Sequence, residues 1–372
     1  MHKTEIKKEL YAKIIGWIAF FLITAGTIMI LSSSIATYKL NIFLSHLTRL
    51  ILGIIAWFLC YQFDYKKWQN LSPLLLVIAF GLLIVTAATG LSQNGSVRWI
   101  YGIHGQVADV ARFAIIIYLA AFIARKKNVM KDLTKGFIPP IFITALFLGL
   151  IIIQPDLSTT FTIGVIVFLT LCTAGARLLH LFVLSVLAVG VIWIAIESNP
   201  YQKERMKTFM DPYSDPQGSG YQIIQSYESL NSGDWTGVGL GASLRKHFYL
   251  PAAHTDFIVS IIGEELGFLG TFILLLLQFV FFTVGMRISK ITSDTFGKYL
   301  AYGISLSIFL YAIINTMVAV GMFPVTGLPM PFISYGGSML VVSMASVGIL
   351  MNIAKTRTRT SFPNQGIVYD LP

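Results

Sequence analysis

Repeated runs of about 20 apolar residues dominate this sequence and limit the folds that it can adopt. A run of that length suits an α-helix that crosses the hydrocarbon core of a bilayer. Hydrophobic residues make up 55% of the 372 residues and charged residues only 12%, which is far from the composition of a soluble domain. The sequence therefore predicts an all-α polytopic membrane protein. Ten spans fit, with cores near 13–32, 41–62, 71–91, 106–124, 137–153, 159–175, 178–197, 256–284, 298–318 and 335–354.

The basic residues between these runs predict the orientation of the chain. Lysines and arginines gather in every second connection and near both ends, and the alternate connections carry fewer of them. Because cytoplasmic loops carry such an excess, we expect both termini in the cytoplasm and the first run to be an uncleaved first helix. The same distribution accounts for the net charge of +10 without one basic soluble face. No nucleic-acid partner is expected.

One long connection, residues 198–255, separates the seventh and eighth spans on the predicted outer side. A structured loop of this length is usually functional. Within it, Tyr221–Leu230 is amphipathic enough for a short helix. The glycine-rich run 233–241 suits a close-packed backbone that a phosphate can approach.

The connection 321–338 carries no Lys or Arg but several prolines and glycines. It is expected to be an irregular loop at membrane depth, which is tolerated where it is buried in protein or lines a wet cavity. The whole chain, 1–372, then forms one membrane domain, which ends in a short basic cytoplasmic tail over 355–372.

Carboxylates at the start of the eighth span are the first candidates for chemistry, because ionisable groups in a membrane are costly and functional by default. Asp256 suits a general base, and the alternative is a plain helix N-cap. Glu264 and Glu265 follow about two turns deeper. Helical rotation turns them away from the face of Asp256, so we expect them to pack against polar positions of neighbouring spans.

Other polar residues near the predicted outer ends of the spans are candidates for structural or functional roles. Asp109 and Arg112 share a helix face and either neutralise each other or line a polar cavity. Arg98 is either an interface anchor or a phosphate contact. Asp156 is expected to cap the sixth span. His254 is expected to be a hydrogen-bonding loop residue, because no second His or Cys stands at ligand spacing, and no metal site is predicted.

Several motifs together resemble the SEDS family, whose members include FtsW, RodA and SpoVE. They are Leu250-Pro-Ala-Ala-His-Thr-Asp256-Phe-Ile, Gly263-Glu-Glu-Leu-Gly267, Pro331-Phe-Ile-Ser-Tyr-Gly-Gly-Ser338, Asn94-Gly-Ser-Val-Arg-Trp-Ile100, Gln154-Pro-Asp-Leu157 and Gly220-Tyr-Gln-Ile-Ile-Gln-Ser226. The resemblance covers nearly the whole chain, and Trp235–Gly241 is more like the FtsW/SpoVE division branch. At the fourth span the family's Glu and Lys are replaced by Asp109 and Arg112, which keeps both charges and changes their geometry.

The resemblance implies a peptidoglycan glycosyltransferase that polymerises lipid II into β-1,4-linked glycan strands at the outer face of the bacterial cytoplasmic membrane. Asp256 is then the catalytic residue, which deprotonates or orients the acceptor hydroxyl in an inverting reaction that releases undecaprenyl diphosphate. The candidates for substrate binding are Arg98, Asp109, Arg112, Arg205, Lys246 and His254. Polar support is assigned to Asp156, Glu264, Glu265 and Ser334.

The resemblance also implies partners and a location. A class B penicillin-binding protein and other division proteins are the expected partners, at the division septum. No cofactor is required, although a divalent cation, Mg²⁺ or Mn²⁺, could assist the leaving diphosphate. An alternative of a different class is a lipid II flippase, and a third is a non-catalytic scaffold of a division complex in which Asp256 is only a helix cap.

Overall fold

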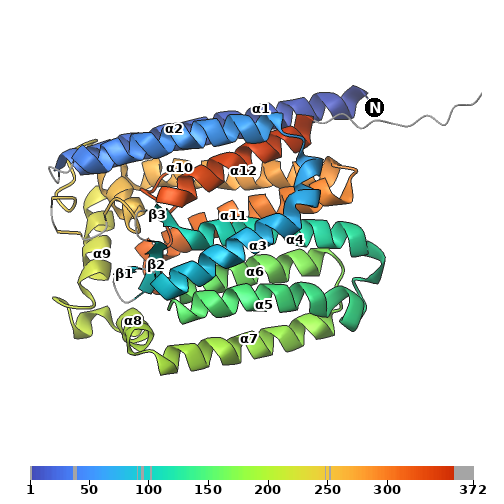
Figure 1. Cartoon of the computed structure of the whole chain (residues 1–372). Helices are drawn as coiled ribbons and strands as arrows, with labels where there is room; N and C mark the ends of the chain where they lie inside the picture. The colour runs from blue at the N-terminus through green and yellow to red at the C-terminus, as the bar shows by residue number, and fades with distance from the viewer. Residues whose placement is uncertain are drawn as a thin grey trace, which may run out of the picture.

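The computed structural model describes residues 2–36, 40–89, 91–93, 96–100, 103–247, 249–250 and 253–355. Within these ranges the chain forms a bundle of long helices with a small sheet at one end (Figure 1). Nine helices of the described residues are long and apolar enough to cross a membrane. They are α1 (His2–Ala36), α2 (Leu40–Gln62), α3 (Tyr65–Thr89), α4 (Val107–Lys126), α5 (Ile138–Ile153) together with the helical turn Leu133–Phe137 that leads into it, α7 (Leu178–Ser198), α10 (Ile258–Ile291), α11 (Thr295–Ala319) and α12 (Gly337–Lys355).

The predicted sixth span corresponds to a shorter apolar helix, α6 (Leu157–Thr173). Each of the ten predicted spans thus has a helix, and the prediction of a helical, multi-pass membrane protein is confirmed. The short η1 (Lys127–Val129) and η2 (Leu133–Phe137) connect α4 to α5. The predicted tail beyond residue 355 lies outside the described residues.

The elements of the long connection gather at one end of the bundle. They are α8 (Pro200–Met210), η3 (Pro212–Ser214) and α9 (Tyr221–Gly233), which lie at the end opposite the labelled N-terminus in Figure 1. The predicted helix at Tyr221–Leu230 is confirmed as α9, whereas α8 was not predicted. The charges predict that this end faces outward, and we call it the outer end.

A three-stranded antiparallel sheet lies at the same end, where no strand was predicted. Its strands β1 (Leu91–Gln93), β2 (Ser96–Ile100) and β3 (Ile103–Gln106) follow in chain order. Val97 pairs with Ser92, and Trp99 pairs with Gln106. Strands this short carry too few residues for an alternating pattern to be recognised. Arg98 lies on β2, and its side chain lies outside the described structure.

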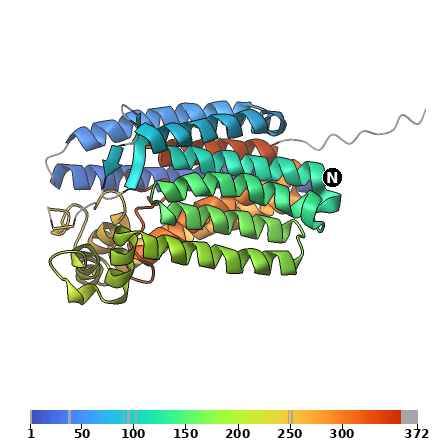
Figure 2. The ribbon, with the colours of Figure 1, turned by 60° about the horizontal axis from the view of Figure 1, so that its bottom comes forward.

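Helices α4, α11 and α12 are the most deeply buried spans, and α7 is the most exposed. Figure 2 shows α7 along one edge of the bundle. Its exposed side chains include Leu178, Phe182 and Trp193, as suits a helix that faces lipid. The buried core contains large aromatic side chains such as Phe281 and Phe296.

Helix α10 is broken at Gly267, where φ is 67° and ψ is −168°. The glycine-rich run fills this break, because Phe268 N–H donates to the Asp234 carbonyl at 2.8 Å and Leu269 N–H to the Trp235 carbonyl at 3.1 Å. A Cβ atom on Gly267 would clash with the nitrogen of Gly237, so the packing needs glycine there. The sequence predicted one continuous span over 256–284, and the break depends on this non-local insertion.

The insertion also changes the reading of the glycine-rich run. Val238 N–H donates to the Glu264 carbonyl at 2.9 Å, and Gly239 N–H donates to the Glu265 carbonyl at 3.0 Å. The run therefore packs against α10. The amides of Val238 and Gly239 are already bonded to the helix, so the prediction that a phosphate can approach the backbone of the run is wrong at these two amides.

The segment between α11 and α12 is irregular and buried, as predicted. Residues 326–334 are all buried. Side chains of neighbouring spans satisfy its carbonyls: Gln278 Nε2 donates to Pro331 O at 3.1 Å, and Asn315 Nδ2 donates to Leu328 O at 2.8 Å. Ser334 Oγ accepts a hydrogen bond from Met330 N at 2.8 Å, which gives Ser334 a supporting contact inside the loop. Irregular backbone is therefore tolerated at this depth because protein groups surround it.

Candidate active site

Asp256 lies in a turn at the outer end of the bundle, directly before α10. The helix begins at Ile258, and Phe257 occupies the N-cap position. Asp256 lies one residue earlier, so it is not the N-cap of α10. Asn315 Nδ2 from α11 donates to the Asp256 carbonyl at 2.9 Å, and Tyr335 N–H donates to the His254 carbonyl at 2.8 Å. The backbone is held from two sides while the Asp256 side chain is partly exposed.

A stack of three side chains adjoins this turn. The rings of His254 and Tyr335 lie edge to face, with centroids 5.5 Å apart. The guanidinium carbon of Arg49, on α2, lies 4.4 Å from the centroid of the Tyr335 ring. Arg49 was missed in the sequence analysis, which counted basic residues between the spans. The signal was available, because Arg49 is the only Lys, Arg, Asp or Glu within the predicted second span, 41–62.

Glu264 binds the long connection. Its carboxylate accepts hydrogen bonds from Ser229 Oγ at 2.9 Å, Ser243 Oγ at 2.6 Å and Leu244 N at 2.9 Å. The carboxylate is buried, and these groups replace the water that an ionised carboxylate would otherwise need.

Glu265 is buried against Lys246. Lys246 Nζ lies 2.6 Å from Glu265 Oε1 and donates to Ser32 Oγ of α1 at 2.8 Å. Gly241 N donates to Glu265 Oε2 at 3.0 Å. We call Glu264, Glu265 and Lys246 the loop anchor. The prediction that both glutamates pack against neighbouring spans is wrong for most of their contacts, because only Ser32 belongs to a span and the other partners belong to the long connection.

Helix α9 covers the start of α10. Ser226 Oγ lies 2.6 Å from Ser260 Oγ and donates to the Ala319 carbonyl at 2.7 Å. Tyr227 packs directly over Gly321, whose φ is 70°. Burial raises the pKa of the Tyr227 phenol above its ordinary value. The contacts of Ser226 and Tyr227 hold α9 close to the Asp256 turn.

Asp109 and Arg112 lie on one face of α4 and form a buried pair, as their spacing predicted. The Arg112 Nη2 to Asp109 Oδ1 distance is 3.6 Å, and Ser338 Oγ donates to Asp109 Oδ2 at 2.6 Å. The Arg112 guanidinium lies 4.1 Å from the centroid of the Tyr311 ring. Ser338 and Tyr335 belong to one short segment, which therefore touches both the Asp109 pair and the His254 turn.

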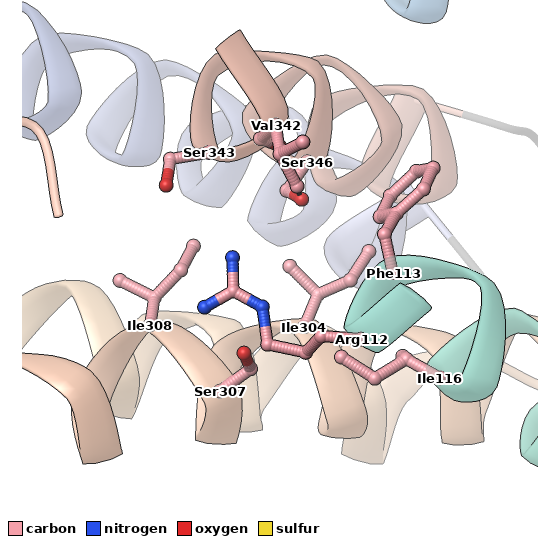
Figure 3. Close-up of a pocket in the computed structure, with 9 residues that line it drawn as sticks. All are labelled: Arg112, Phe113, Ile116, Ile304, Ser307, Ile308, Val342, Ser343 and Ser346. Carbon is pink, nitrogen blue, oxygen red and sulfur yellow. Dashed lines mark hydrogen bonds between the residues drawn. The ribbon is translucent and has the colours of Figure 1, made fainter. Parts of the chain in front are cut away.

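A small cavity adjoins this pair between α11 and α12. Figure 3 shows the Arg112 guanidinium pointing into it, with Ser307 on one side and Ser343 on the other. Its volume of about 10 Å³ is close to the space that one water needs. Arg112 Nη1 is buried without a hydrogen-bond partner among the described residues. Asp109 and Arg112 therefore pair, and Arg112 of the two also lines the cavity.

The remaining predicted residues lie elsewhere. Asp156 is confirmed as the N-cap of α6, where its carboxylate accepts from Thr159 N at 3.2 Å. Arg205 lies on α8 with its guanidinium 4.5 Å from the centroid of Tyr201. Among the residues that the structure describes, no three His, Cys, Asp or Glu side chains converge to hold a metal ion. The described residues therefore do not form a ready-made site for Mg²⁺ or Mn²⁺.

The fold and the outer polar site define a multi-pass membrane protein with one partly exposed carboxylate on a rigid turn. The chain belongs to the FtsW/RodA/SpoVE family of cell cycle proteins, whose model matches residues 13–359. It is 37% identical over 367 residues to a Shewanella sediminis protein named probable peptidoglycan glycosyltransferase FtsW, covering 95% of this chain and 89% of that protein. It is also 37% identical over 350 residues to stage V sporulation protein E of Bacillus subtilis, covering 91% and 95%.

Two solved structures share this fold. One is a chain of a peptidoglycan synthase complex, with a TM-score of 0.77 and 24% identity over 93% of this chain and 98% of that chain. The other is the rod shape determining protein RodA of Thermus thermophilus, with a TM-score of 0.68 and 21% identity over 92% and 95%.

Proposed function

We propose that this protein is a peptidoglycan glycosyltransferase that polymerises lipid II at the outer face of the cytoplasmic membrane. Its relatives in Shewanella sediminis and other bacteria carry the name of that activity, which supports the reaction class. One observation of this chain carries the proposal further than the names do. Asp256 is partly exposed on a turn that Asn315 and Tyr335 hold through its backbone, as a general base requires.

In the proposed reaction Asp256 removes the proton of the 4-hydroxyl of the acceptor N-acetylglucosamine. The resulting oxygen nucleophile attacks C1 of the donor N-acetylmuramic acid from the face opposite the diphosphate. The new C1–O bond forms as the bond to the diphosphate breaks, and the configuration at C1 inverts. The electron pair of the broken bond stays on undecaprenyl diphosphate, and the proton stays on the Asp256 carboxyl group.

The leaving diphosphate needs positive charge nearby. The sequence offers Arg98, Arg205 and Lys246 for this role, and Lys246 is buried in its ion pair with Glu265. Arg112, another candidate for substrate binding, is paired with Asp109. Arg98 and Arg205 remain candidates from the sequence. Lys246 is better suited to holding the long connection in place than to contacting substrate, because both of its bonds are to protein groups in the anchor region.

Two finer assignments belong to the same proposal. We assign the enzyme to septal wall synthesis, because the glycine-rich run resembles the division branch of the family. We also expect it to act with a class B penicillin-binding protein, as the family's membrane polymerases do. In cells depleted of this protein, loss of peptidoglycan labelling at the septum, with labelling of the side wall intact, would support the assignment to septal wall synthesis.

The test is polymerisation of labelled lipid II by the purified protein together with its cognate class B penicillin-binding protein. Replacing Asp256→Asn removes the base without changing side-chain volume, and we expect a loss of about 10²- to 10⁴-fold in rate. Glu204→Gln makes the same carboxylate-to-amide change at an exposed site on α8 and should polymerise like the unmodified protein. Both variants must keep the unfolding midpoint of the unmodified protein.

Other outcomes select other functions. Normal polymerisation by the Asp256→Asn protein would remove Asp256 from the mechanism. Loss of lipid II flipping in vesicles, with polymerisation intact, would favour the flippase. If neither activity depends on any residue of the outer site while assembly with division proteins does, the chain is a scaffold.

A further inference from the structure

We propose that Arg49 is the residue that binds the diphosphate of the lipid-linked substrate. Neither the sequence motifs nor the names of the relatives assign Arg49 a role. The inference rests on the proposed function, since it specifies which group of this chain meets the anionic part of that substrate.

The Arg49 guanidinium has few polar partners among the described residues. Nη1 of Arg49 is buried and has no hydrogen-bond partner among the described residues, and no carboxylate in that part of the chain pairs with the guanidinium. Its contact is with the face of the Tyr335 ring, 4.4 Å away. A cation within a membrane span is costly and is expected to have an anionic partner. The missing partner is therefore supplied by a ligand.

Three cations that the structure describes toward the outer end differ from Arg49 in this respect. Lys246 lies 2.6 Å from the Glu265 carboxylate, and Arg245 forms an ion pair with Glu228. Arg112 is paired with Asp109 within the same helix. Each of these cations is already matched by a carboxylate of the protein, so each would have to give up an anion before it bound another. Arg49 would gain one.

Position connects Arg49 to the reacting groups. Arg49 lies over Tyr335, the Tyr335 ring contacts His254, and Asp256 follows His254 by two residues. Below Arg49, His46 Nε2 lies 3.2 Å from Thr27 Oγ1 of α1, which ties α2 to α1 at this level. The guanidinium is thereby fixed on the same side of the bundle as the Asp256 turn.

The chemistry of guanidinium suits a diphosphate. Its planar group of N–H donors can bind two oxygens at once, and stacking on an aromatic ring uses the face of the group and none of its N–H donors. Lysine would keep the charge and lose this paired geometry. The same chemistry would also recognise the phosphate of an anionic phospholipid, so the experiment must separate an undecaprenyl diphosphate from a phospholipid headgroup.

The test measures binding in the Asp256→Asn protein, which has no turnover in the proposed mechanism. The probes are undecaprenyl diphosphate and phosphatidylglycerol, each titrated into the purified full chain in detergent and followed by native mass spectrometry. We expect Arg49→Gln to raise the Kd for undecaprenyl diphosphate by about 10- to 100-fold, the loss of a charge-assisted hydrogen-bonded contact. Binding of phosphatidylglycerol should not change. Arg177→Gln, an exposed arginine at the start of α7, is the matched control.

The results that would overturn the proposal are equally specific. An unchanged Kd for undecaprenyl diphosphate in a folded Arg49→Gln protein removes Arg49 from the site. An equal loss for phosphatidylglycerol reassigns Arg49 to a headgroup. If Arg49→Gln lowers the unfolding midpoint, Arg49→Lys replaces it: a rise of Kd by about 3- to 10-fold supports the paired geometry, and no rise contradicts it.

The binding result is separate from the fate of the proposed function. If Asp256→Asn still polymerises lipid II while Arg49→Gln weakens diphosphate binding, the assignment of the base fails and the diphosphate site stands. If Asp256→Asn is inactive while Arg49→Gln binds diphosphate normally, the reaction stands and the assignment of Arg49 fails.

Discussion

Lys246–Glu265 and Asp109–Arg112 are both buried ion pairs, and they differ in how completely hydrogen bonds surround them. Both oxygens of Glu265 are bonded, to Lys246, to Ser32 and to the amide of Gly241, at 2.6 to 3.2 Å. The charges of Asp109 and Arg112 approach only to 3.6 Å, and one nitrogen of the guanidinium has no partner among the described residues.

The difference separates two uses of buried charge. A buried pair offsets its desolvation only when the geometry is good and the remaining lone pairs and protons are bonded. The Lys246–Glu265 pair, which we call the outer pair, meets that condition and fixes the long connection to α1 and α10. The pair in α4 meets it only in part and adjoins a cavity, so its side chains can rearrange at lower cost. Lys246–Glu265 is therefore completely bonded and structural, whereas Asp109–Arg112 is incompletely bonded.

The largest effect is expected from breaking the outer pair. Glu265→Ala would leave Lys246 buried without its anion, and we expect the free energy of unfolding to fall by about 3 to 5 kcal/mol. Denaturant unfolding of the purified protein in detergent measures this. The double variant Glu265→Ala with Lys246→Met removes both charges and should recover part of the loss. A single variant as stable as the unmodified protein would end the structural interpretation.

The pair in α4 should respond more weakly. Arg112→Lys keeps the positive charge near Asp109 and gives up the stacking on Tyr311 together with a nitrogen that makes no hydrogen bond. We expect the rate of lipid II polymerisation to fall by less than about tenfold, which corresponds to about 1.4 kcal/mol of barrier. Arg177→Lys is the control for the exchange itself. A larger loss would mean that the planar guanidinium is necessary at position 112.

An exposed pair sets the scale for the other two. Lys203 Nζ and Glu197 Oε2 lie 2.6 Å apart, the same separation as in the outer buried pair, but the two side chains are 48% and 47% exposed. Because water screens this pair, Lys203→Ala should change the free energy of unfolding by less than about 1 kcal/mol. The same denaturant assay measures it. If the exposed and buried variants lost equal stability, distance rather than burial would determine the energy of these pairs.

The sequence predicted features that depend on local chemistry. Asp156 caps α6 by accepting a hydrogen bond from the amide of Thr159, three residues further along the chain. Such a local contact can be predicted without knowing the rest of the fold. Asp109 and Arg112 pair because they lie three residues apart on one helix. The buried segment between α11 and α12 was predicted from its prolines, its glycines and its lack of Lys and Arg.

Features that depend on distant segments were missed. The helical rotation that separated Glu264 from Asp256 assumed a helix that includes Asp256, whereas α10 begins at Ile258 and is broken at Gly267. The partners of Glu264 come from a connection that lies 20 to 35 residues upstream. Arg49 was missed for another reason, because its proposed role depends on its contact with Tyr335 and on an Nη1 without a hydrogen-bond partner among the described residues, and only the packed structure shows these.

The break in α10 also makes the long connection and the helix a single cooperative unit. The amides of Phe268 and Leu269 bond to carbonyls of residues 234 and 235, and the carbonyls of Glu264 and Glu265 bond to amides of residues 238 and 239. If the glycine-rich run detached, these four backbone hydrogen bonds would break at once near a membrane surface. The run cannot loosen residue by residue, so its amides should exchange with solvent in one concerted opening.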